Sequence, residues 1–217
     1  MADNIERMKK QLDFLLELDK MKNIYRRTYI LCDDLPAGSK EFEDNFKERK
    51  PLPRRENDAE HSFSLAVAAL VLAEYSNEPV DTAKVVKMVL VHDVVEIDAG
   101  DTFLYDAEGN KTKREREAAA AERIFGLLPP DQQAEFRCFW DEFEANNTPE
   151  SRFANALDRI QPMLLNYTRD GISWKEHNVR FDDVAERNSH IKDGSEELWD
   201  YVYSLLEDAN SRGILPR

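Results

Sequence analysis

Residues 61–75 read HSFSLAVAALVLAEY, a run that is apolar on nearly every face of a helix and decides the fold. A helix with this pattern is buried on most sides, so we expect it at the centre of the molecule. Either Asp58 or Asn57 can cap its start. A second apolar run, 81–97, contains KMVLVHDVVEI and has the β-branched content of a buried strand. Its length and the capping residue Asp81 favour a second core helix.

Amphipathic segments surround these two runs. Apolar residues at helical spacing, or clear start signals, predict further helices over the following segments: 3–20, 113–125, 131–144, the segment that starts at Thr148-Pro149, and 196–209. The 217 residues contain only 7 glycines and 9 prolines, fewer turn-forming residues than a chain of many short strands would need. We therefore expect an all-α protein, a single-domain helical bundle over residues 1–217.

The formal net charge is −14 at pH 7, and a field of that sign repels polyanions. We therefore expect no nucleic-acid partner, whereas a small phosphorylated substrate is compatible if a cation and arginines reverse the charge locally. The segment 1–20 lacks the continuous apolar run of a signal peptide or membrane span. Two cysteines, Cys32 and Cys138, form no CxxC pair, which is typical of a reduced compartment. The chain is expected to be cytoplasmic, with no membrane partner.

His61 and the pair His92-Asp93 stand inside the two apolar runs. Burial of an ionised carboxylate without a partner is costly, so Asp93 requires compensation. A divalent cation supplies it, and imidazoles beside a carboxylate are ordinary ligands of first-row transition metals. The alternative is a hydrogen-bonded core pair, with His61 as a satisfied helix-end histidine. Spacing alone leaves both interpretations open.

Two further acids extend this group. Asp158 lies in an otherwise core-facing apolar stripe, and Pro162 opens the helix hydrogen bond to its carbonyl, which would bend the helix there. The alternative is a surface helix with a chance proline. Glu96 follows Asp93 on the same helix face, where a carboxylate can accept the proton of an attacking water. Its alternative is a solvent-facing glutamate at a helix end.

The chain resembles the HD-domain phosphohydrolase superfamily in three strings: RENDAEHS at 55–62, HDVVEIDAGD at 92–101 and ANALDRIQPMLLNY at 154–167. Within it, the most similar branch contains bacterial 5'-deoxynucleotidases. The similarity extends from Leu12 to the final helix, and the ordered H…HD…D set is far more specific than a lone HD pair. The resemblance implies a helical bundle of the HD-domain type.

The resemblance also assigns roles to the matching residues. Metal ligation falls to the ordered set His61, His92, Asp93 and Asp158. Activation of water falls to Glu96, and Asp101 helps to organise substrate and water. Arg26 matches an arginine that reaches the substrate phosphate, a role that suits a guanidinium fork. The family often has a tryptophan next, but this chain has Arg27, so a preference for deoxyribonucleotides does not carry over.

The number of metal ions is expected to be one. Dinuclear members of the superfamily insert further histidines before the final aspartate, and this chain has no histidine between Asp93 and Asp158. His177 and His190 follow in a polar stretch and are expected to be structural. A mixed nitrogen and oxygen donor set suits one divalent transition metal ion, with manganese, cobalt, iron, nickel and zinc all compatible.

The expected function is metal-dependent hydrolysis of a phosphomonoester, most simply a nucleoside 5'-monophosphate. One alternative is hydrolysis of another phosphoester such as a signalling nucleotide. Another is a metal-stabilised sensor that binds a nucleotide without turnover; oxygenase chemistry is disfavoured because it usually needs two irons. The resemblance also implies a homodimer, since members of the superfamily commonly dimerise.

The stretch 32–55 is charged throughout and is interrupted by three prolines and a glycine. We expect a loop there, with a flexible charged insertion at 33–53 that is longer than in compact members of the superfamily. One hypothesis is a mobile flap over the site, because both ends adjoin expected site residues. A solvated surface insertion is at least as consistent with this composition.

Overall fold

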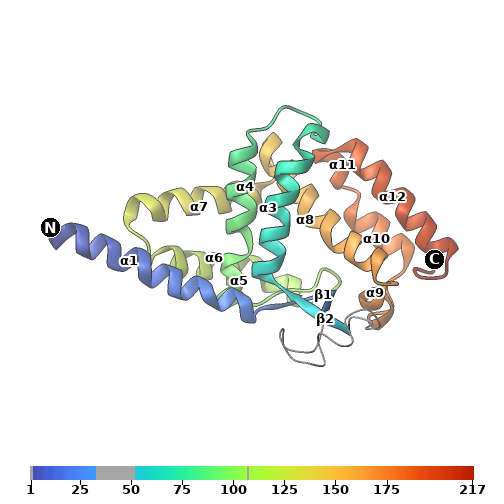
Figure 1. Ribbon diagram of the computed structural model, residues 1–217, viewed down its shortest axis with the longest axis horizontal. Coiled ribbons are helices and arrows are strands. Elements are labelled where there is room, and N and C mark those ends of the chain that lie inside the picture. Colours follow the sequence, from blue (N-terminus) through green and yellow to red (C-terminus); the bar gives the residue numbers. More distant parts are fainter. Residues whose placement is uncertain (1, 33–51, 107) are drawn as a thin grey trace, which may run out of the picture.

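A computed structural model describes residues 2–32, 52–106 and 108–217 (Figure 1). It contains the elements α1 (Ala2–Leu18), β1 (Tyr25–Cys32), β2 (Leu52–Asn57), α3 (Asp58–Leu72), α4 (Thr82–Val91), α5 (Glu96–Ala99), α6 (Gly109–Phe125), α7 (Pro130–Ala145), α8 (Pro149–Thr168), α9 (Ile172–Glu176), α10 (Phe181–Asn188), α11 (Ile191–Gly194) and α12 (Glu196–Ser211). Short 3₁₀ turns cover Asp19–Asn23, Ala73–Tyr75 and His92–Val95. The expectation of an all-α bundle is confirmed, and the one described sheet is a small antiparallel pair.

Helices α3, α4 and α8 form the centre of the molecule. Each contacts the other two, and they share a buried core that includes Leu65, Met88, Phe153 and Leu157. Helices α6 and α7 lie on one side of this centre, and α10 to α12 lie on the other (Figure 1). The run 61–75 supplies the central helix α3, as expected, whereas the run 81–97, expected to be one helix, is divided into α4, a 3₁₀ turn and α5. Among the described residues, no helix combines the length and apolarity needed to cross a membrane.

The helix starts follow from capping side chains. Asn57, rather than Asp58, caps α3: its side chain accepts from the backbone N–H of Glu60, and the Glu60 side chain accepts from the backbone of Asn57. Asp81 caps α4 by accepting from two backbone N–H groups. Thr148 caps α8, and the helix continues across Pro162. The start signals read from the sequence are confirmed at α4 and α8.

The expected loop at 32–55 is wrong at both ends. Cys32 ends β1, and Leu52–Asn57 pairs with it as antiparallel β2. Strand β1 carries Tyr, Thr and Ile, residue types that fit a half-buried pleated surface better than a helix. The remainder of the insertion, 33–51, lies outside the described residues. The sheet matters for the site because Arg26 and Arg27 project from β1.

Helix α3 is less buried than its composition suggests. Phe63, Val67, Leu70 and Val71 form an exposed side of the helix, with 67% of Phe63 and 65% of Leu70 accessible. Exposed apolar residues also follow α1 and reach α4, namely Ile5, Met8, Leu12, Leu15, Leu16 and Leu90. The expectation that α3 is buried on most sides is therefore wrong for this side. We call these residues of α1, α3 and α4 the apolar face.

Gly194 marks the close approach of α11 to α8. A Cβ atom there would overlap the backbone carbonyl oxygen of Arg152 and press on the Cβ of Ala156. Because backbone atoms cannot move aside cheaply, we expect Gly194→Ala to lower the free energy of unfolding by about 1–3 kcal/mol. Urea denaturation measures this loss. Lys192→Ala, on the exposed side of the same short helix, is the control and should change stability little.

Candidate metal centre and active site

The site begins with three side chains that come from separate elements. His61 lies on α3, His92 follows the end of α4, and Asp158 lies in the middle of α8. Their ligand atoms all lie within 4.8 Å of one another. The Nε2 atom of His61 is 2.9 Å from Oδ1 of Asp158, and Nε2 of His92 is 3.6 Å from the same oxygen. Packing of the three central helices thus brings together residues 97 positions apart in the chain.

Asp93 joins the cluster through the 3₁₀ turn His92–Val95. Its Oδ2 atom lies 3.1 Å from Nε2 of His92 and 3.8 Å from Nε2 of His61. A 3₁₀ turn has three residues per turn, so side chains three positions apart lie above one another. Asp93 and Glu96 consequently face the same side, and the His92 ring packs beside Phe143 with its Nε2 toward the cluster. We expected a continuous helix here, and helical spacing also places Glu96 on the same face as Asp93.

The donor atoms fit a bound transition metal ion. Nδ1 of His92 donates to the carbonyl oxygen of Val89 at 2.9 Å, which leaves the lone pair of Nε2 free in the neutral ring. That Nε2 atom is buried and has no hydrogen-bond partner among the described residues. Ligands held at about 2.1 Å from one ion lie about 3.0–3.4 Å apart, close to the separations of these donors. The chemistry and spacing of the set therefore suit one cation.

Gln161 and Glu56 orient the ring of His61 from behind the donor set. The amide nitrogen of Gln161 donates to Glu56 at 2.6 Å, so its oxygen faces Nδ1 of His61 at 3.0 Å and accepts from it. Nε2 of His61 then meets Asp158 as an acceptor facing an acceptor, an arrangement that a cation between them relieves. Gln161 and Glu56 were not identified from the sequence. Gln161 lies three residues after Asp158, a spacing that places both on one helix face and could have revealed it.

We expect Gln161→Leu to weaken metal binding by about 10- to 100-fold, because the leucine removes the acceptor that fixes the His61 ring. Titration of the metal-free protein with Mn²⁺ by calorimetry measures the change. The matched control is Arg152→Met on the same helix, since Arg152 pairs with exposed Glu78 outside the site. Equal Mn²⁺ affinity in Gln161→Leu and the wild type would contradict the orienting role.

The charges of the cluster call for a positive group at its centre. Burial alone would lower the pKa of His92, but Asp93 and Asp158 outweigh it and raise that pKa to about 10. Burial would raise the pKa of Asp158, yet the adjacent side chains of His61 and His92 hold it well below its usual range. Arg26 supplies a positive charge beside Asp93, because its Nη1 donates to Oδ2 of Asp93 at 2.6 Å. A divalent cation satisfies the same demand.

Glu96 belongs to a second group of buried acids with Asp93 and Asp58. Their carboxylate oxygens lie within 4.8 Å of one another. Burial, together with Asp93 and Asp58, raises the pKa of Glu96 well above its usual value. Burial and then Asp93 raise the pKa of Asp58 to about 8. Asp58 was considered only as a helix cap, although its position three residues before His61 puts it on the inner face of α3.

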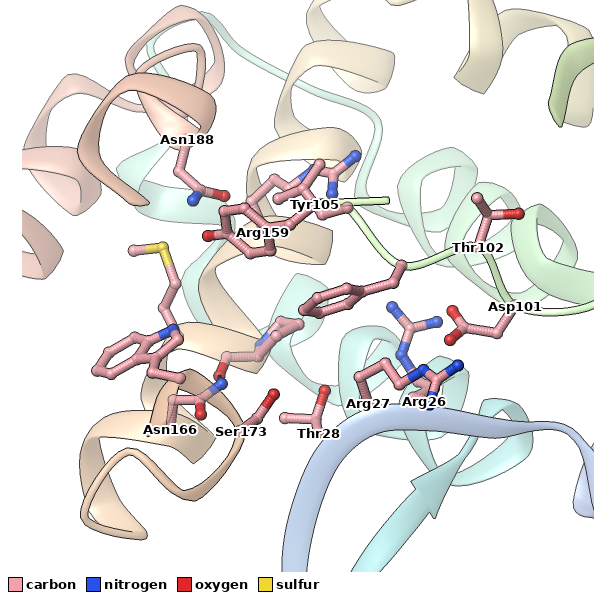
Figure 2. A pocket seen from close by; sticks show the side chains of 15 residues that line it. Arg26, Arg27, Thr28, Asp101, Thr102, Tyr105, Arg159, Asn166, Ser173 and Asn188 are labelled. Atoms are coloured by element: carbon pink, nitrogen blue, oxygen red, sulfur yellow. Dashed lines mark hydrogen bonds between the residues drawn. The ribbon is translucent and has the colours of Figure 1, made fainter. Parts of the chain in front are cut away.

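A pocket opens beside the cluster. Its walls include Arg26, Arg27, Asp101 and Arg159, with Asn166 at the other end (Figure 2). Burial raises the pKa of Asp101, while Arg26 opposes that shift. The structure therefore brings Arg26 and Asp101 to the mouth of the expected metal site. Arg27 stands at the pocket wall as well.

Comparison with known proteins gives the family. The model of the HD domain family matches residues 45–199. The chain belongs to the HD domain family. The match spans His61, His92, Asp93 and Asp158, and this HD protein is thus identified over more than half of its length.

Relatives of this HD protein are enzymes by name. The chain is 29% identical to 5'-deoxynucleotidase HDDC2 of Bos taurus over 141 residues, which are 64% of this chain and 67% of that protein. The crystal structure of a predicted metal-dependent phosphohydrolase from Magnetospirillum magnetotacticum MS-1 is 44% identical, with a TM-score of 0.81 over 98% of this chain and 100% of that one. An HD-domain phosphohydrolase from Listeria innocua shares the fold at 16% identity, with a TM-score of 0.58 over 94% and 95% of the two chains.

Proposed function

We propose that this HD protein is a metal-dependent phosphohydrolase that cleaves phosphomonoesters, with nucleoside 5'-monophosphates as its substrates. The observation that carries the proposal is the buried donor set of His61, His92 and Asp158 beside a pocket with arginines on its wall. Similarity to 5'-deoxynucleotidases and to a metal-dependent phosphohydrolase supports the substrate class. Asp93 completes the ligand set in this proposal.

Each side chain has a task in the proposed reaction. His61, His92, Asp93 and Asp158 would hold one divalent ion, which would supply Lewis acidity for the phosphoryl group and the attacking water. Glu96 accepts the proton of that water, and burial raises its pKa well above its usual value. Arg26 neutralises phosphoryl oxygens, and Asp101 holds water and substrate in line. The buried surroundings strengthen these interactions because water screens them less.

A phosphate-release screen tests the proposal. Metal-free protein is loaded separately with Mn²⁺, Co²⁺, Fe²⁺, Ni²⁺ or Zn²⁺ and offered ribo- and deoxyribonucleoside 5'-monophosphates. Release of phosphate from at least one monophosphate is the expected result. Tight nucleotide binding without release would support a sensor instead, and turnover of signalling nucleotides alone would replace the substrate class. Paired ribo and deoxy substrates report on Arg27, which lines the pocket.

A homodimer in a cytoplasmic setting is part of the proposal. The apolar face spans α1, α3 and α4, and a shallow pocket with Leu15, Ser62 and Leu90 on its wall joins these helices. Exposed apolar surface of this extent is typical of a protein interface.

We expect Leu70→Glu to convert a dimer to a monomer, because the charge would be buried without a partner. Light scattering after gel filtration measures the mass, and Tyr201→Glu, an exposed aromatic on α12, is the control.

A further inference from the structure

Arg159 stands between two cavities of the site. It follows Asp158 on α8 and lines the pocket shown in Figure 2. It also lines a second, polar cavity whose walls include His92, Asp93 and Lys113. The side chain is 28% exposed, so most of it is removed from solvent. A cation in this position borders both the expected metal ligands and the expected substrate pocket.

The Nε atom of Arg159 is a buried donor that no described residue accepts from. The carboxylate of Asp158 lies 3.7 Å from Nε, which is too long for a hydrogen bond. The Nε atom of Arg26 is likewise without a partner, but Arg26 donates through Nη1 to Asp93, whereas no hydrogen bond joins Arg159 to another described side chain. A buried donor without an acceptor costs free energy, and an anionic ligand in the pocket would remove that cost.

Arg159 and Arg26 flank the same carboxylate. Nη2 of Arg26 is 3.7 Å from Oδ1 of Asp158, and Nε of Arg159 is 3.7 Å from Oδ2. The two cations come from β1 and α8 and therefore approach the Asp158 side chain from different elements. An ion held by Asp158 would lie close to both guanidinium groups. A phosphoryl group on that ion has peripheral oxygens to spare for planar, charged donors.

We propose that Arg159 is a second phosphate-binding arginine, which donates to the phosphoryl group together with Arg26. The proposal rests on the proposed function, since it takes a phosphomonoester as the ligand. The competing interpretation is structural: Arg159 could serve only to hold Asp158 in position for the metal. The two interpretations differ in a measurable way, because a structural role would weaken metal binding and a ligand role would weaken anion binding.

The test measures binding of inorganic phosphate to the Mn²⁺-loaded protein by calorimetry. We expect Arg159→Met to weaken phosphate binding by about 10- to 100-fold, the usual effect of losing hydrogen bonds to a charged group. Methionine keeps much of the apolar stem, so packing on α8 changes little. Mn²⁺ affinity of the phosphate-free variant should stay within about twofold of the wild type. Arg152→Met on the same helix is the control and should change neither affinity.

A conservative variant keeps the test decisive. Arg159→Lys retains the charge but not the planar fork, so phosphate affinity should fall between the wild type and Arg159→Met. If Arg159→Met does not fold, Arg159→Lys alone decides the question through the same two affinities. Unchanged phosphate affinity, or a loss of Mn²⁺ affinity that accounts for the loss of phosphate, would overturn the proposal. The measurement needs no turnover, so it separates failure here from failure to hydrolyse nucleotides.

Discussion

An Asp158→Asn variant is expected to bind Mn²⁺ more than about 100-fold more weakly than the wild-type chain and to release no phosphate above background. Oδ1 of Asp158 is the oxygen that both His61 and His92 approach, at 2.9 Å and 3.6 Å. The amide keeps the size of the side chain but removes its charge, and its N–H group can point at the histidine lone pairs. Calorimetric titration with Mn²⁺ and the phosphate-release assay measure the two losses.

The control for this prediction is Glu150→Gln. Glu150 is another acid on α8, but it lies in the first turn and pairs with Lys84 rather than with the site. Its Mn²⁺ affinity should equal that of the wild type within error. Asp158→Asn protein that retains both tight Mn²⁺ binding and phosphate release would exclude Asp158 from the ligand set.

The parts of the site that follow from the sequence are those with a local signature. His92 and Asp93 interrupt an apolar run, Asp158 stands in a core-facing stripe, and each of these breaks in pattern is visible without a structure. Glu96 was found because three-residue spacing works in a 3₁₀ turn as well as in an α-helix. Breaks in local pattern therefore predicted that His92, Asp93 and Asp158 are buried.

The parts that were missed depend on contacts between distant segments. Glu56 meets Gln161 across 105 residues, a pairing that no local pattern encodes. Asp58 resembles a helix cap in the sequence, but in the structure Asn57 caps the helix and Asp58 is fully buried. Strand β1 was missed because pairing with β2, far along the chain, decides its conformation.

The composition of α3 also shows a limit of apolar patterning. Leu65 is fully buried and Leu70 is 65% exposed, although the two stand in the same uninterrupted apolar run. Hydrophobicity measures the gain from leaving water, but it does not specify the partner that covers the surface. An all-apolar helix can therefore lie against its own core on one side and present an interaction surface on the other.

A Glu96→Gln variant is expected to lose turnover by about 100- to 10,000-fold while it keeps its metal. Glu96 lies in the acid group with Asp58 and Asp93, and its Oε2 is buried without a hydrogen-bond partner among the described residues. The amide preserves size and removes the proton-accepting oxygen. Single-turnover phosphate release measures the loss, and Mn²⁺ titration checks that the ion still binds.

The control for Glu96 is its neighbour on α5, because Asp98 is partly exposed and pairs with Arg123 outside the site. Asp98→Asn should keep wild-type turnover.

The pH profile of turnover adds a measurement that a purely structural role of Glu96 would not change. A general base works only when ionised, so a raised pKa of Glu96 means that wild-type turnover falls as the pH drops through that pKa. The residual activity of Glu96→Gln should lack this acid limb. A variant that keeps both the rate and the limb would transfer the proton-accepting role to another acid of the cluster, with Asp101 the first to test.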